Sequence, residues 1–167
     1  MKRTLLVLAV IGLCILFAET SFAQTSAQQT VNLAVNAVSR IAITGAPISL
    51  TIVAGTEGSD NLTPVTDNSS TYSITHNSNT ALRMTASLDQ ALPAGYTLQV
   101  GLTPTAGKGN SLGNVDISNA TSTAVDVVTG IPHGADANRP ILYTFSALAS
   151  AGTLASTQRI VTITLTN

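Results

Sequence analysis

The sequence is poor in charged and aromatic side chains. Of its 167 residues, 9% are charged and 4% are aromatic, and there is no tryptophan. An average soluble domain contains about 25% charged residues. A nucleic-acid binder needs clustered lysine and arginine to neutralise phosphates, so this composition argues against nucleic acid as a partner. The basic residues after position 23 are few and scattered: Arg40, Arg83, Lys108, Arg139 and Arg159.

Cysteine and long apolar runs are also scarce. Cys14 is the only cysteine, and it lies in an N-terminal apolar stretch, residues 5–17. That stretch is shorter than the roughly 20 residues that a membrane-spanning helix needs, and no later segment is a candidate. Without a second cysteine the chain forms no internal disulfide, so its core and its sheet hydrogen bonds must hold the fold.

The N-terminus has the three parts of a secretory signal peptide. Met1, Lys2 and Arg3 precede the apolar stretch, and small residues at Ser21 and Ala23 fit a cleavage site before Gln24. We therefore predict an exported protein that is periplasmic, on the cell surface or extracellular. The predicted parts are a signal peptide at 1–23, a flexible leader at 24–30 and a β-sandwich domain at 31–167. The alternative, a lipoprotein modified at Cys14, is disfavoured because Leu13 precedes the cysteine.

Threonine, serine and asparagine make up 49 of the 144 residues from position 24 onward. They alternate with apolar residues at period two, which puts the apolar side chains on one face of a strand. Glycine, proline and asparagine separate the runs and predict turns. This pattern predicts an all-β fold, a single immunoglobulin-like β-sandwich of about nine mostly antiparallel strands. The expected strands are 31–43, 48–54, 72–76, 82–88, 96–102, 115–117, 125–127, 141–147 and 161–165.

Titratable residues show no catalytic or metal-binding spacing. We expect His76 at a strand end facing the rim of the sandwich, and His133 in a loop. We interpret residues 107–110 as a flexible turn rather than a phosphate loop. We predict no enzyme activity, no catalytic residues, no cofactor and no metal. Two alternatives stay open: a hydrolase whose groups meet only in the fold, and calcium bound by loop oxygens near Asp60 or Asp136.

The two ends of the chain are alternating and largely uncharged. They read TVNLAVNAV over residues 30–38 and QRIVTITLTN over residues 158–167. Together with DNSSTYSIT at 67–75, RMTASLD at 83–89 and DVVTG at 126–130, they resemble small secreted bacterial β-sandwich proteins. More distantly the chain resembles pilin-like subunits of the spore-coat-U or archaic chaperone–usher type. That resemblance implies that the N-terminal strand of one subunit completes the sheet of the next. The chain departs from those families because it lacks their usual disulfide.

The end segments supply the candidate strand-pairing residues, which are Val31, Leu33, Val35, Val161, Ile163 and Leu165. Two arrangements fit the sequence. The segments pair within one molecule as ordinary strands, or residues 30–43 are exchanged between subunits. The expected partners are then the protein itself or other surface proteins.

The expected function is that of a secreted, non-enzymatic structural or adhesion-type surface protein, in its sharper form a self-assembling fibre or coat subunit. The alternative is a soluble carbohydrate- or ligand-binding module. Such modules commonly present aromatic platforms. The period-two pattern turns the aromatic residues of the expected strands inward instead: Tyr72, Tyr96, Tyr143 and Phe145.

Overall fold

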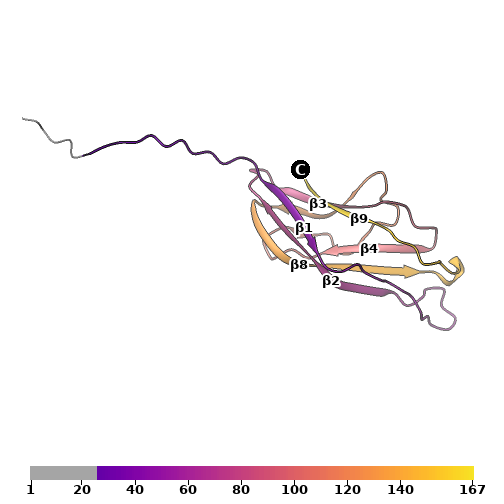
Figure 1. Cartoon of the computed structure of the whole chain (residues 1–167). Coiled ribbons are helices and arrows are strands. Elements are labelled where there is room, and N and C mark those ends of the chain that lie inside the picture. Colours follow the sequence, from indigo (N-terminus) through magenta and orange to yellow (C-terminus); the bar gives the residue numbers. More distant parts are fainter. Residues whose placement is uncertain (1–25) are drawn as a thin grey trace, which may run out of the picture. The chain divides into compact units, whose positions relative to one another are not determined.

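The computed structural model describes residues 26–167, and the predicted all-β sandwich of about nine strands is confirmed. Residues 36–167 form nine strands in two antiparallel sheets that face each other (Figure 1). The predicted signal peptide at 1–23 and the start of the predicted leader lie outside the described residues. Within the described part of the chain, no helix is long and apolar enough to cross a membrane.

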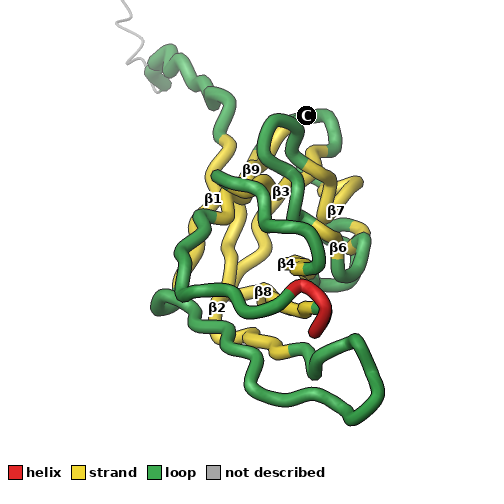
Figure 2. The backbone as a smooth tube through the Cα atoms, turned by 90° about the vertical axis from the view of Figure 1, so that its right-hand side faces the viewer, coloured by secondary structure: helices red, strands yellow, loops and turns green. Residues whose placement is uncertain are grey.

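The longest connection, residues 45–64, joins the first two strands, and a single turn of 3-10 helix, η1, precedes the last strand (Figure 2). The elements are β1 (Ser39–Thr44), β2 (Val65–His76), β3 (Leu82–Leu88), β4 (Tyr96–Leu102), β5 (Asn110–Ser111), β6 (Val115–Asp116), β7 (Val125–Ile131), β8 (Gly134–Ala147), η1 (Ala149–Ala151) and β9 (Val161–Thr166).

The two sheets have the strand orders β1-β2-β8-β4-β6 and β5-β7-β3-β9. Their inner faces carry the alternating apolar side chains expected from the sequence, so the core lies between the sheets. In β3, for example, Leu82, Met84, Ala86 and Leu88 are all buried. Tyr96 and Phe145 stack with ring centroids 6.4 Å apart. All the tyrosines are buried, as the inward pattern predicted.

Three predicted details of the strands and turns are wrong. The strand expected over 31–43 begins only at Ser39, and residues 26–38 form no strand. No strand forms over 48–54, although Ile48 and Leu50 still pack on the core. Both edges of β2 are already occupied, by β1 and β8, so this segment finds no free edge there. The turn expected over 107–110 includes the first residue of β5, which pairs with β7.

Two bulges let β2 and β8 stay paired over most of their length. One extra residue lies on β2 between Asp67 and Ser70, where the Ser69 hydroxyl and N–H donate to the Asp67 carboxylate and lower its pKa. The other lies on β8, where Asn138 has a φ of 54°. Asparagine tolerates this left-handed conformation better than most residues. The bulges restore the inward direction of the side chains that follow them.

His76 ends β2, as expected, but it faces the interior rather than the rim. Its side chain is 2% exposed, and neither ring nitrogen has a hydrogen-bond partner in the described residues. His133 lies exposed between β7 and β8, in agreement with the loop setting expected for it. The two histidines therefore lie in opposite environments, one in the core and one at the surface.

Candidate functional site

The outermost strands β1 and β9 lie on the same side of the sandwich (Figures 1 and 2). Each is the last strand of its own sheet, and the two strands contact each other across the gap between the sheets. Within residues 26–167, no strand pairs with the outer edge of either one. This side of the domain therefore offers two backbone edges that could accept a further strand.

The outward backbone groups of β9 belong to Val161, Ile163 and Leu165. In an antiparallel ladder, hydrogen-bonded pairs alternate with non-bonded pairs. Asp89 N–H donates to Ile160 O at 3.1 Å, and β9 then pairs with β3 without a register shift. The N–H groups of Thr162, Thr164 and Thr166 therefore point to β3. The N–H and C=O groups of Val161, Ile163 and Leu165 point away from β3, and we call this set the β9 edge.

The edge of β1 follows the same rule. Asn77 N–H donates to Val38 O at 3.1 Å, so the bonded pairs fall on even-numbered residues of β1. The N–H groups of Ser39, Ile41 and Ile43 point away from β2. Ile41 is half-buried and Ile43 is exposed, so β1 is held mainly by its hydrogen bonds to β2 rather than by core packing.

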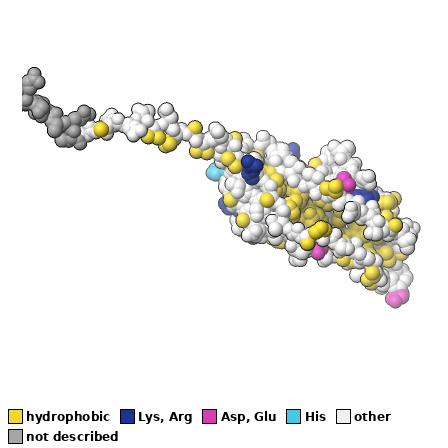
Figure 3. Space-filling view, viewed as in Figure 1, with side chains coloured by type: hydrophobic (Ala, Val, Ile, Leu, Met, Phe, Trp, Pro, Cys, Tyr) yellow, Lys and Arg dark blue, Asp and Glu magenta, His cyan; other side chains and the backbone are white. Residues whose placement is uncertain are grey.

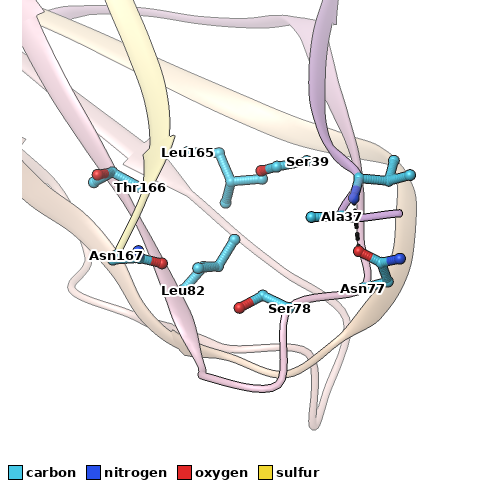
Figure 4. Close-up of a pocket in the computed structure, with 9 residues that line it drawn as sticks. Ala37, Ser39, Asn77, Ser78, Leu82, Leu165, Thr166 and Asn167 are labelled. Atoms are coloured by element: carbon cyan, nitrogen blue, oxygen red, sulfur yellow. Dashed lines mark hydrogen bonds between the residues drawn. The ribbon is translucent and has the colours of Figure 1, made fainter. Parts of the chain in front are cut away.

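A groove of about 440 Å³ opens between the start of β1 and the end of β9. Figure 4 shows its walls: Ala37 and Ser39 on one side, Leu165 and Asn167 on the other. Leu82, from the start of β3, also lines it. We call this hollow the β1–β9 groove. Hydrophobic side chains gather across the middle of the domain in Figure 3, over the region of β1, β9 and β4.

Residues 26–35, which we call the N-terminal segment, form no strand. Val31, Leu33 and Val35 are 67%, 89% and 88% exposed. They alternate with polar or small residues, and the segment carries no charge. An alternating apolar segment is typical of a strand that buries one face, whereas here all three apolar side chains are exposed.

The six candidate strand-pairing residues thus lie in two different settings. Val161, Ile163 and Leu165 belong to β9 and stand opposite Leu88, Ala86 and Met84 of β3. Val31, Leu33 and Val35 pair with no strand in the described part of the chain.

The acidic residues considered for calcium, Asp60 and Asp136, accept hydrogen bonds from the protein. Asp60 accepts hydrogen bonds from the N–H and hydroxyl of Ser150, at 2.7 and 2.8 Å. Asp136 does the same for Thr105, at 2.8 and 2.6 Å. No group of three or more potential metal-ligating side chains occurs among residues 26–167. The Asp60 carboxylate therefore joins the β1–β2 connection to η1, and the Asp136 carboxylate joins the loop after β4 to β8.

Sequence reasoning missed Asn77 and Leu82 as parts of the β1–β9 groove. The sequence places Leu82 on the apolar face of the expected strand 82–88. The available signal for Asn77 was its position one residue after a strand, where an asparagine side chain can bond to neighbouring backbone groups.

A scan against protein-family models found no matching family, and a search of curated proteins found no match.

Proposed function

We propose that this protein is an exported structural subunit of a coat, matrix or fibre, and that it assembles with copies of itself. The N-terminal segment of one copy would add to the β9 edge of the next, in the manner of β-augmentation. The single observation that carries the proposal is that one chain contains both an exposed apolar segment and a sheet edge, each without a neighbouring strand in the described residues. Val31, Leu33 and Val35 are exposed and pair with no strand among residues 26–167, while the β9 edge has outward backbone groups beside a groove that Leu82 and Leu165 help to line.

The chemistry of the two surfaces is complementary. The N-terminal segment is uncharged and free of proline, so each of its residues can both donate and accept in a ladder. A strand added at the β9 edge would lie over the gap between the sheets, where three apolar side chains on one of its faces could turn toward the core. Export is expected from the predicted signal peptide, and the threonine side chains on the outer faces of the strands supply hydroxyl groups for hydrogen bonds at the surface.

The test is the mass of the purified protein in solution, measured by chromatography with light scattering over a range of concentrations. The wild type should form a ladder of multimers. A variant with Val31, Leu33 and Val35 all changed to Ser should remain monomeric, because it keeps the length of the segment but loses its apolar face. The matched control, Asn32→Ser with Ala34→Ser, alters the other face and should assemble like the wild type.

At a concentration low enough that all three proteins are monomeric, circular dichroism should show the same β content and melting temperature, because the changed residues lie outside the strands of the monomer. A wild type that stays monomeric at every concentration, and after unfolding and refolding, would overturn the proposal. Equal assembly by the triple variant would also overturn it, since multimers would then form without the N-terminal segment.

A further inference from the structure

Asn77 fastens the residues that precede β1 by three hydrogen bonds. Its N–H donates to Val38 O at 3.1 Å, and its side-chain Oδ1 accepts from Val38 N–H at 2.7 Å. Its Nδ2 donates to the carbonyl oxygen of Asn36 at 2.8 Å. Figure 4 shows the Asn77 side chain beside the groove, joined by a dashed line to the chain that enters β1. We call these three bonds the Asn77 clasp.

The clasp imitates a continuing strand after β2 has ended. In a regular ladder, Val38 N–H would donate to the main-chain carbonyl of Asn77, and Asn36 O would accept from the N–H of Asn79. The chain turns away at this point, and the hydroxyls of Ser78 and Thr80 bond to each other. The carboxamide of Asn77 replaces both missing backbone groups, because it carries one acceptor and one donor with amide geometry.

A related contact lies at the start of the other outer strand. Asp89 follows β3 directly, its N–H donates to Ile160 O, and its Oδ1 accepts from Ile160 N–H at 2.9 Å. A carboxylate has no donor, so Asp89 holds only the residue opposite it. The amide of Asn77 reaches two residues further along its partner. Because the Asn77 side chain has both a donor and an acceptor, it holds residues 36–38 in line with β1, beyond the end of β2.

We propose that Asn77 is a latch that holds residues 36–38 on the β1 side of the β1–β9 groove and thereby directs the N-terminal segment to a second copy. Residues 37–39 form one wall of that groove. A segment rooted in this wall and released from the clasp could turn across the groove and pair with β9 of its own chain. Such self-pairing would cap the edge that another copy needs. This inference rests on the proposed function, since it concerns how the same edge is kept available.

Hydrogen exchange tests the latch itself. In Asn77→Ala, the amides of Val38 and of the bonded β1 residues Arg40 and Ala42 should exchange at least about tenfold faster, because two side-chain hydrogen bonds are lost. The control is Asn79→Ala, whose side chain is exposed and makes no hydrogen bond in the described residues. In Asn77→Asp the acceptor for Val38 remains, so Val38 should stay protected while the bond to Asn36 is lost. Equal exchange in Asn77→Ala and Asn79→Ala would overturn the latch.

Thiol crosslinking tests the directing role. Val31→Cys and Thr164→Cys in a Cys14→Ser background allow a short flexible bismaleimide to join the segment to β9 of the same chain only after self-pairing. The intramolecular product should rise at least about threefold when Asn77→Ala is added, consistent with the loss of about one net hydrogen bond. It should not rise when Asn79→Ala is added. An equal yield in both backgrounds would overturn the directing role.

The two failures can be told apart. If the wild type is monomeric at all concentrations, the proposed function fails, while exchange and intramolecular crosslinking still judge the latch. If the wild type forms multimers but Asn77→Ala changes neither exchange nor crosslinking, the latch fails and the proposed assembly stands.

Discussion

The carboxylate of Asp136 accepts two hydrogen bonds from Thr105, one from its backbone N–H at 2.8 Å and one from its hydroxyl at 2.6 Å. Asp136 is buried on β8, opposite Ile74 of β2, and Thr105 lies between β4 and β5. Hydrogen bonds to a charged acceptor are stronger than neutral ones. The contact therefore fastens this loop to the end of the sheet that also carries His76.

Asp136→Ala should lower the free energy of unfolding by about 2–3 kcal/mol, because it removes a buried charged acceptor and leaves two donors without it. Chemical denaturation measures the change. The control is Asp126→Ala, which removes an exposed ion pair with Arg83 whose N–O distance is 3.4 Å. That change should cost less than about 1 kcal/mol. Similar losses in both variants would show that the Thr105 contact has no special importance for the fold.

Tyr72 should make the fold sensitive to alkaline pH. Burial raises the pKa of its hydroxyl to about 12, and the carboxylate of Asp136 acts in the same direction while Arg139 opposes it. The folded pKa is higher than the ordinary value of about 10, so the folded state holds this proton more tightly. The resulting stabilisation is complete below pH 10 and is lost as the pH rises from about 10 to about 12.

Denaturation curves between pH 8 and pH 12 should show a loss of about 2 kcal/mol that is absent in Tyr72→Phe. Part of any alkaline decline should persist in that variant, because burial also raises the pKa of Tyr143. A Tyr72→Phe protein whose stability falls as steeply as that of the wild type would contradict this assignment.

The sequence predicted which apolar side chains of β3 face the core, but it misplaced His76 and did not predict which strands pair. Period-two alternation identifies the buried face of β3 residue by residue. The alternation does not show whether a neighbouring strand has a free edge. Residues 48–54 therefore have the sequence pattern of a strand but pair with no neighbouring strand. The two-residue strand β5 is too short to show a period. The Asn138 bulge depends on a left-handed backbone that asparagine permits but does not require.

The candidate site was predictable in the same partial way. Alternation marked both ends of the chain as strand-forming, and Val161, Ile163 and Leu165 do form a strand. Whether Val31 and Leu33 have a partner depends on where the edge of β2 ends, and that end is set by the turn at Ser78–Thr80. The clasp by Asn77 joins residues 41 positions apart. Contacts of this range follow from the completed fold and leave no local pattern in the sequence.

The alternation of bonded and free backbone groups along β9 gives a matched pair of variants. Val161→Pro removes an outward N–H that bonds to nothing in the domain, whereas Thr162→Pro removes an N–H that points to β3. Proline is tolerated on edge strands when its position faces outward. Val161→Pro should therefore stay folded but reduce self-association at least about fivefold, because the incoming strand loses a hydrogen bond and meets the proline ring.

Thr162→Pro should instead lower the melting temperature, because it breaks the β3–β9 ladder in the sheet itself. Light scattering reports self-association and thermal denaturation reports folding, so the two effects separate. If Val161→Pro assembled as well as the wild type, the incoming strand would have to use another edge. The remaining edge on this side is that of β1, where the N–H groups of Ser39, Ile41 and Ile43 point outward. An outward proline at Ile43 would then be expected to block assembly in the same measurement.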